Sequence, residues 1–169
     1  MLKKGFFAII SNVTAATYYT VQLMSEPTKF LCLSQKDAGF RDIKAIEDLS
    51  NDCKFYYDES KLVNMSRKYL CRESGSGNFH GCLTKSAPNT LLSFLRTQNN
   101  SFVIKQANYV MSFGEYDADR SHYKLIGLIQ KPNINIEDKL LIRKYKRDTN
   151  EQVNLAQGNL EDNKLYSGF

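Results

Sequence analysis

Few residues in this chain have side chains that could do chemistry. It has two histidines, His80 and His122, and a nucleophile paired with imidazole would need one of them beside a Cys or Ser. His80 precedes Cys82 by two residues, so on a β-strand both side chains would point to the same face. One Cys and one His are at best half of a zinc site, and a disulfide at Cys82 would remove its thiolate. We therefore expect His80 to be structural or exposed, and His122 to face solvent at the start of a strand.

Other candidate sites lack part of their pattern. Asp117 and Asp119 flank one loop residue, but no further oxygen ligands follow at the spacing of a calcium loop. Gly75 and Gly77 lie between expected strands, with no helix after them and no Gly-Lys-Ser/Thr, so they do not predict a phosphate site. No pair of catalytic acids stands out. The sequence predicts no catalytic residue, no metal site and no required cofactor, and therefore a protein that is not an enzyme.

The four cysteines constrain the compartment. They are Cys32, Cys53, Cys71 and Cys82, and an even count fits two disulfides of a secreted protein, with three possible pairings. Four buried free thiols in a cytosolic protein are the alternative. No Cys-x-x-Cys motif offers a third explanation, so we favour disulfides and an extracellular location.

Length, composition and charge indicate one ordinary folded domain over residues 1–169. The chain is 42% hydrophobic and 24% charged, which argues against disorder. The net charge of +5 is a milder excess than a dedicated nucleic-acid binder usually carries, so no nucleic-acid partner is predicted. The longest apolar run near the start, residues 6–10, is far too short to span a membrane.

Period-two alternation indicates that most of the chain forms half-buried β-strands. Turn residues separate the segments, and the ten tyrosines and ten phenylalanines suit strands. About eight strands at this spacing predict an all-β up-and-down barrel or a sandwich. The expected strands are 18–23, 30–34, 53–57, 68–72, 79–84, 91–96, 102–113 and 123–130.

A different pattern follows the last expected strand. Residues 135–148 read as one α-helix, with Asn135 as N-cap, acidic residues in the first turn and basic residues in the last. Its apolar side chains would pack on the outside of the sheet. Residues 149–169 are expected to form an extended tail.

The stretch ATYYTVQLMSEPTKFLC, residues 16–32, resembles the first signature of the lipocalins, a Gly-x-Trp-Tyr opening followed by a bend and a Phe. Tyr18 takes the place of the Trp, and Tyr19 matches. Residues 95–104 resemble the second signature, Thr-Asp-x-x-x-Tyr, with Thr97 matching. Lys131 stands where the family has a lone Arg after the last strand. The expected helix and tail resemble arthropod bilin- and retinoid-carrier lipocalins.

The resemblance implies an eight-stranded antiparallel up-and-down barrel with a helix outside, whose interior holds one small ligand. Tyr18 and Lys131 would close one end through an aromatic–cation contact. The usual family disulfide to the C-terminal region cannot form, because no Cys follows residue 82. Candidate ligand-binding residues on the inward strand faces are Phe55, Tyr57, Tyr69, Phe79, Phe94, Tyr109, Met111, Phe113 and Tyr123.

Three functions fit these observations. A secreted carrier would bury a small hydrophobic molecule, of pigment, retinoid, fatty-acid or sterol type, inside the barrel. A lipocalin-type scaffold would instead bind or inhibit another protein through its loops, and an interior filled by side chains would favour it. An intracellular basic module would stack nucleic-acid bases on Tyr and Phe, and four reduced cysteines would favour that function.

Overall fold

The computed structural model describes residues 17–119, 121–129 and 133–153, and within them the chain is built from β-strands and short 3-10 turns. No helix in these residues is long and apolar enough to cross a membrane. The strands are β1 (Thr17–Leu23), β2 (Lys29–Leu33), β3 (Ala38–Asp42), β4 (Phe55–Asp58), β5 (Lys61–Asn64), β6 (Tyr69–Arg72), β7 (Phe79–Cys82), β8 (Leu92–Arg96), β9 (Phe102–Gln106), β10 (Tyr109–Asp117), β11 (His122–Ile129), β12 (Leu140–Lys146) and β13 (Gln152–Val153). The 3-10 turns are η1 (Ile46–Asp48), η2 (Asn51–Cys53), η3 (Gln98–Asn100) and η4 (Ile136–Asp138).

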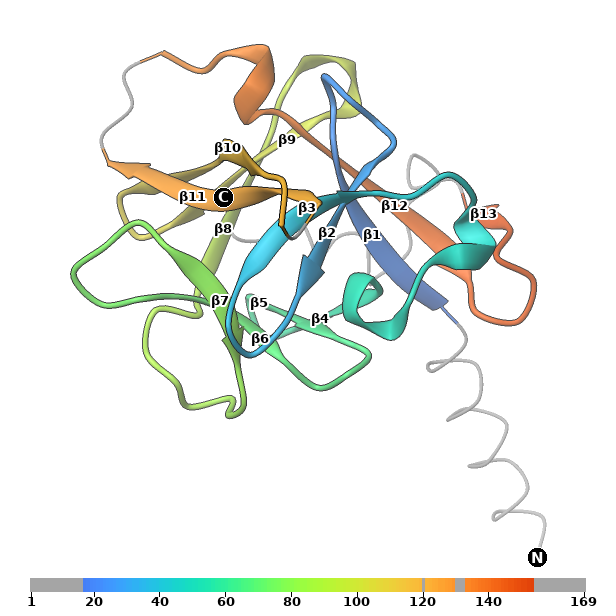
Figure 1. The fold of residues 1–169 in the computed structure, drawn as a ribbon, viewed down its shortest axis with the longest axis horizontal. Helices are drawn as coiled ribbons and strands as arrows, with labels where there is room; N and C mark the ends of the chain where they lie inside the picture. The colour runs from blue at the N-terminus through green and yellow to red at the C-terminus, as the bar shows by residue number, and fades with distance from the viewer. Residues whose placement is uncertain (1–16, 120, 130–132, 154–169) are drawn as a thin grey trace, which may run out of the picture.

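Seven of these strands close into an antiparallel barrel (Figure 1). Around the ring the order is β1, β2, β3, β11, β10, β9 and β12, and β12 pairs with β1 to complete it. Strands β4 to β7 continue from β1, while β8 pairs with β9 and β13 with β12. The prediction of an all-β barrel is confirmed, and the predicted count of eight barrel strands is wrong.

The strand count differs partly because the chain turns back on itself within a segment that the alternating pattern predicted as one strand. The expected strand 102–113 divides into β9 and β10 at a two-residue turn in which Ala107 has φ of 53°. Pairing of Tyr109 with Gln106 then makes a hairpin. Several other expected strands, among them β4, β6, β7 and β8, lie outside the ring.

The predicted helix over 135–148 is also wrong, because most of it is strand β12. A single 3-10 turn, η4, comes first, and the backbone N–H of Asn135 donates to the Asp138 carboxylate at 2.9 Å. From Leu140 to Lys146 the chain then pairs residue by residue with β1. This ladder pairs the backbone groups on the facing edges of both strands. That pairing selects a strand where the spacing of the apolar residues also fits a helix. Of the predicted tail, residues 149–153 include β13, and the remainder lies outside the described residues.

Strand β1 is buried on both faces. One face carries apolar side chains, and the other carries polar ones as well. Tyr19, Val21 and Leu23 belong to the main hydrophobic core. On the other face Thr20 Oγ1 donates to Gln22 Oε1 at 2.8 Å, and Gln22 Nε2 donates to the Pro27 carbonyl at 2.7 Å. The polar face can be buried because its groups find hydrogen-bond partners.

Tyr18 shares that second face and anchors a smaller hydrophobic cluster with Phe30, Cys32, Leu49, Cys53 and Tyr145. Its ring stacks on Tyr145 with centroids 5.5 Å apart, and its hydroxyl donates to Asn150 Oδ1 at 2.7 Å. Lys54 Nζ lies 5.0 Å from the ring centroid. Burial raises the pKa of the Tyr18 phenol to about 12, and Tyr145 and Glu47 add to the shift.

Two disulfides cross-link the chain, as the cysteine count predicts. Cys32 on β2 is bonded to Cys53 in η2, and Cys71 on β6 is bonded to Cys82 on β7. These bonds are consistent with an extracellular protein.

His122 is buried, which corrects the expectation that it faces solvent. Its side chain is 2% exposed, and its Nε2 lies 3.8 Å from Asp37 Oδ2, in the turn between β2 and β3. Gly39 on β3 leaves the space for the ring, because a Cβ there would lie 1.9 Å from His122 Cδ2. This contact fixes β11 against the β2–β3 hairpin.

Replacing Gly39 by Ala should therefore destabilise the fold by about 1–3 kcal/mol, the usual cost of overpacking. Urea unfolding at neutral pH measures the change. Gly114→Ala is the matched control, because a Cβ at Gly114 meets nothing closer than 3.4 Å. Equal stabilities of the two variants would contradict the packing argument.

The raised pKa of Tyr18 predicts a loss of stability at high pH. The unfolded chain releases the phenolic proton near pH 10 and the folded chain near pH 12. The contribution of the Tyr18 phenol to the free energy of unfolding is thus complete below pH 10 and is lost as pH rises towards 12. Urea unfolding at several pH values across this window measures how the free energy of unfolding falls with pH. That fall should be smaller for Tyr18→Phe than for the wild type. Tyr56→Phe, at a tyrosine that is 40% exposed, should decline as the wild type does. If Tyr18→Phe also followed the wild type, the assignment to Tyr18 would fail.

Candidate functional site

The predicted ligand-binding residues are mostly part of the packed core. Phe55, Phe79, Phe94 and Met111 are at most 1% exposed and belong to the main hydrophobic cluster. Tyr57, Phe113 and Tyr123 are partly buried and pack against the same cluster. Tyr57 and Phe94 meet edge to face, with centroids 5.8 Å apart. These side chains thus fill space between the strands by contacting one another.

The other two predicted ligand-binding residues, Tyr69 and Tyr109, are not members of that cluster. The Tyr69 hydroxyl donates to Asp58 Oδ2 at 3.5 Å, and its pKa is raised by burial first and by the Asp58 carboxylate next. The Tyr109 ring packs against the Arg72 guanidinium, whose Cζ lies 3.8 Å from the ring centroid. The structure therefore does not bring all nine predicted residues into one site.

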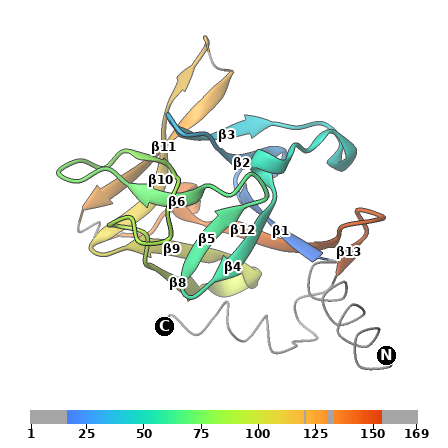
Figure 2. The ribbon, with the colours of Figure 1, turned by 90° about the horizontal axis from the view of Figure 1, so that it is seen from below.

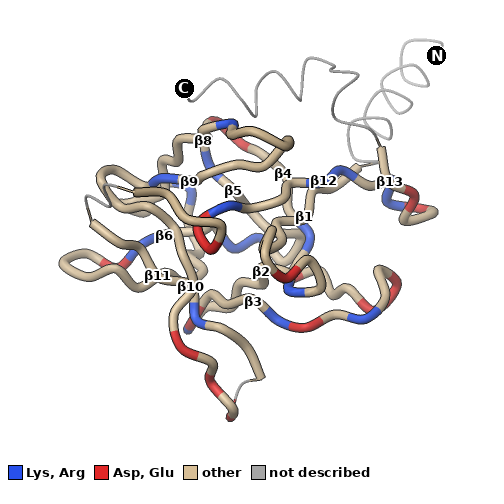
Figure 3. Tube along the Cα trace, turned by 90° about the horizontal axis from the view of Figure 1, so that it is seen from above, with Lys and Arg blue, Asp and Glu red and all other residues tan. Residues whose placement is uncertain are grey.

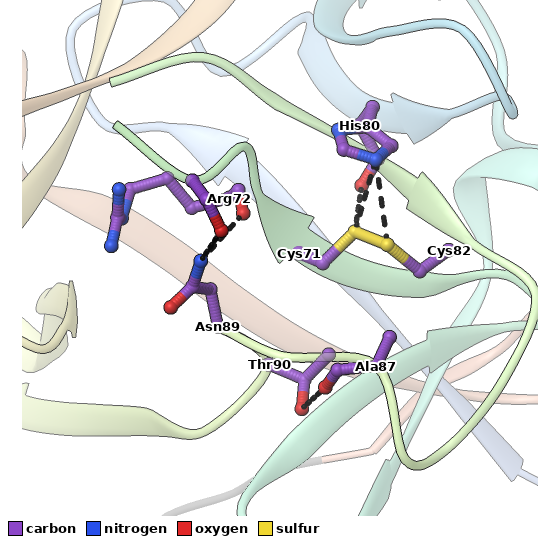
Figure 4. Close-up of a disulfide and its surroundings, with 8 residues drawn as sticks. Cys71, Arg72, His80, Cys82, Ala87, Asn89 and Thr90 are labelled. Atoms are coloured by element: carbon purple, nitrogen blue, oxygen red, sulfur yellow. Dashed lines mark hydrogen bonds between the residues drawn. A yellow bond between two sulfur atoms is a disulfide. The ribbon is translucent and has the colours of Figure 1, made fainter. Parts of the chain in front are cut away.

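Arg72 is a buried cation that sequence reasoning missed. Its Nε donates to Gln106 Oε1 at 2.8 Å, and a terminal guanidinium nitrogen donates to the carbonyl of Ser76 at 2.8 Å. Asn89 donates in turn to the Arg72 carbonyl at 3.1 Å (Figure 4). The guanidinium therefore links the β6–β7 loop, through Ser76, to β9, through Gln106, and Tyr109 covers its face.

Of the two residues predicted to close one end of the barrel, Tyr18 and Lys131, the structure describes Tyr18. Lys131 lies outside the described residues. Tyr18 is fully buried, and the cation described over its ring is Lys54.

The most distinctive exposed feature is a cluster of three aromatic rings and a lysine on the β10–β11 hairpin and the start of β2. We call Lys29, Phe113, Tyr116 and Tyr123 the aromatic surface. Tyr116 and Tyr123 meet edge to face at 5.3 Å between centroids, and Phe113 lies 5.1 Å from Tyr123. Lys29 Nζ lies 5.8 Å from the Tyr116 centroid and 5.4 Å from that of Tyr123. Tyr116 is 51% exposed, so it presents its ring to solvent while the others support it.

Local backbone features place these side chains together. An irregularity in the β10–β11 register between Phe113 and Tyr116 brings Tyr116 opposite Tyr123. Tyr123 also pairs with Phe40 on β3, and the β2–β3 hairpin places Lys29 opposite Asp42. The hairpin end projects beyond the body of the barrel (Figure 2). The aromatic surface is thus accessible, but its base is anchored in the barrel.

Acidic residues occur along the projecting end of the hairpin (Figure 3). Glu115 and Asp119 are exposed, and Asp117 is half-buried. The backbone N–H of Asp119 donates to Asp117 Oδ1 at 3.0 Å, which shapes the turn. Aromatic rings and carboxylates therefore lie on the β10–β11 hairpin, and Lys29 lies beside the rings from the start of β2. These groups offer an apolar face together with hydrogen-bond donors and acceptors.

Two residues of the aromatic surface were predicted from the sequence, but as part of a ligand site inside the barrel. Phe113 and Tyr123 were predicted as ligand-binding residues of the interior, while Tyr116 and Lys29 were not selected. The signal for Tyr116 lies in the sequence, because Tyr116 and Tyr123 flank the turn at 117–120. Lys29 comes from a different hairpin, so only the pairing of β3 with β11 brings it near.

A second cluster contains Cys71, His80 and Cys82. Cys71 and His80 are directly opposite one another on β6 and β7, and Cys82 lies two residues further along β7. His80 Nε2 is 3.4 Å from each of the two sulfur atoms (Figure 4). The expectation that His80 and Cys82 share a face is confirmed by this contact.

Comparison with solved structures shows similarity in fold. The chain matches part of a mosquitocidal holotoxin with a TM-score of 0.60 and 14% identity, over 75% of this chain and 16% of that one. It matches ThreeFoil, a designed three-fold symmetric β-trefoil, with a TM-score of 0.54 and 11% identity, over 74% of this chain and 96% of that one. A third match is an endo-β-galactosidase from Clostridium perfringens that releases GlcNAcα1-4Gal, with a TM-score of 0.55 and 13% identity, over 82% of this chain and 33% of that one.

At these identities the similarity concerns the fold alone. The chain spans about a sixth of the toxin and a third of the galactosidase, and nearly the full length of the designed protein. No protein-family model matches the chain, and no curated protein matches it in sequence. The resemblance to lipocalins stays a prediction, because these structures are not related to that family.

Proposed function

We propose that this chain is a non-catalytic carbohydrate-binding module that acts outside the cell. The sugar would bind on the aromatic surface, with its ring against Tyr116. The observation that carries the proposal is the exposed ring of Tyr116 beside Lys29, on a hairpin that also carries carboxylates.

The chemistry of a sugar matches this combination of groups. A pyranose has an apolar face of C–H groups and a rim of hydroxyls. Tyr116 offers a flat, rigid ring for the apolar face, and Tyr123 holds that ring edge to face. Lys29 can donate hydrogen bonds to hydroxyl oxygens beside the ring. The turn at the end of the hairpin adds the exposed carboxylate of Asp119 as an acceptor. Binding of this kind forms and breaks no covalent bond.

Packing of the interior favours surface binding over carriage. Carriage of a small hydrophobic molecule inside the barrel stays a prediction, and it would require core side chains such as Phe55, Phe94 and Met111 to move aside. Displacing a well-packed core side chain is costly, typically about 1–3 kcal/mol or more. A sugar on the hairpin requires no such change.

Nucleic-acid binding has less support than sugar binding. The condition that would favour it, four reduced cysteines, is not met, since all four are in disulfides. Acidic residues at the hairpin end would also repel the phosphates of a strand whose bases stacked on Tyr116.

Fold similarity adds support by analogy. One matched protein is described as releasing GlcNAcα1-4Gal, so it acts on a galactose-containing glycan, and this chain resembles a third of it. Glycans that contain galactose and N-acetylglucosamine are therefore the first probes to test.

Replacing Tyr116 by Ala should lower affinity for a bound glycan roughly tenfold or more, as expected for a central aromatic contact. A glycan array identifies the ligand, and titration calorimetry of wild type and variant measures the change. Tyr56→Ala is the matched control, because Tyr56 is 40% exposed but lies on β4, outside the aromatic surface.

Two outcomes would contradict the proposal. If the glycan bound Tyr116→Ala as tightly as the wild type, the aromatic surface would not be the site. If no glycan bound while a hydrophobic fluorophore entered the protein with micromolar affinity, the carrier prediction would be favoured instead.

A further inference from the structure

We propose that reduction of the Cys71–Cys82 disulfide creates a binding site for a thiophilic divalent cation such as Zn²⁺. The ligands would be the two thiolates and the imidazole of His80. This site is separate from the aromatic surface and does not depend on the proposed function.

The three side chains are already arranged on one face of a two-stranded ribbon. Cys71 pairs with His80 across β6 and β7, and Cys82 follows His80 by two residues on the same strand. Their ligand atoms all lie within 4.8 Å of one another. Soft sulfur and imidazole donors are the set that Zn²⁺ prefers over oxygen-rich sites.

Distances to the imidazole fit a tetrahedral ion. With Zn–S bonds of about 2.3 Å and Zn–N bonds of about 2.0–2.1 Å, ligand sulfur and nitrogen atoms are separated by roughly 3.6 Å. His80 Nε2 lies 3.4 Å from both Cys71 and Cys82 Sγ. The imidazole therefore needs little movement, and the main change on reduction is separation of the two sulfurs.

The backbone between the two β7 ligands is held in place. The N–H of Gly81 donates to the carbonyl of Ser34 at 2.8 Å, in the turn after β2. A Cβ at Gly81 would lie 2.7 Å from that carbonyl oxygen, so the strand approaches the turn closely. His80 and Cys82 thus project from a supported segment.

Exposure of the cluster allows access. Cys71 is buried, but His80 and Cys82 are half-buried, so a reductant and an ion can reach the sulfur of Cys82. The other disulfide is less accessible, with Cys32 and Cys53 at 2% and 1% exposure. Three protein ligands leave the fourth tetrahedral position for water.

Each chemical step balances. A phosphine reductant and one water convert the disulfide into two thiols and a phosphine oxide, with two electrons passing from phosphorus to sulfur. Binding of M²⁺ then displaces one proton from each thiol, so that two thiolates neutralise the ion. In the oxidised protein neither thiolate exists, and His80 alone is too weak a site.

Co²⁺ is the probe for the experiment, because tetrahedral cobalt–thiolate complexes absorb in the visible and near ultraviolet. The full chain is reduced with a phosphine under anaerobic conditions and titrated with Co²⁺, which Zn²⁺ then displaces. We expect one ion per reduced chain and no tetrahedral cobalt spectrum from the oxidised chain. His80→Ala should weaken Co²⁺ binding by roughly tenfold or more, since it removes one of three ligands.

Two double variants identify the cysteines involved. Cys32→Ser/Cys53→Ser should keep the cobalt spectrum after reduction, and Cys71→Ser/Cys82→Ser should lose it. A His80→Ala protein that bound Co²⁺ as the wild type does would overturn the proposal, even if either double variant failed to fold. Equal binding by the oxidised and reduced wild type would also overturn it.

Discussion

Closure of the barrel by the β1–β12 ladder is the constraint on which the other features depend. Seven residue pairs join the strands, from Thr17 with Lys146 to Leu23 with Leu140. Strand β1 also pairs with β2 and β4, so it connects the ring to the strands outside it. Without this ladder the ring would be an open sheet with two unpaired edges. Closure also gives β1 an inner face for the core and a second face covered by the Tyr18 cluster.

A closed ring of seven strands leaves an interior narrow enough for side chains to fill, and this decides where binding is possible. Large side chains from the strands outside the ring, such as Phe55, Phe79 and Phe94, complete the core. The side chains that a binding partner can contact therefore lie at the ends and edges of the fold. Tyr116 is exposed near the turn end of the β10–β11 hairpin, where β10 has extended past its pairing with β9 at Tyr109 and Val110.

The sequence predicted the strands whose alternation is local, and it failed where a distant partner decides the structure. Strands β1, β2, β6 and β11 follow from alternating side chains between turn residues. In 140–146, Leu140, Leu141 and Tyr145 fit a helical face as well as a strand, and pairing with β1 selects the strand. Gly39 interrupts the alternation of side chains that would have predicted β3. A glycine is needed there because the buried ring of His122, more than eighty residues away in the chain, occupies the space of a Cβ. The aromatic surface joins two hairpins, so no local pattern could reveal it.

The two disulfides differ in how much the fold needs them. Cys32–Cys53 lies in the Tyr18 cluster and ties η2 to the ring, whereas Cys71–Cys82 joins two strands that are already paired. The loops they close differ in sequence separation, 21 against 11, which by chain entropy alone favours the first bond by about 0.6 kcal/mol. Because its loop is shorter, the Cys71–Cys82 bond removes less entropy from the unfolded chain and adds less to stability than Cys32–Cys53. Of the two bonds, the one that contributes less to the stability of the fold is also the one that contacts an imidazole, so its reduction is the one that the fold tolerates better.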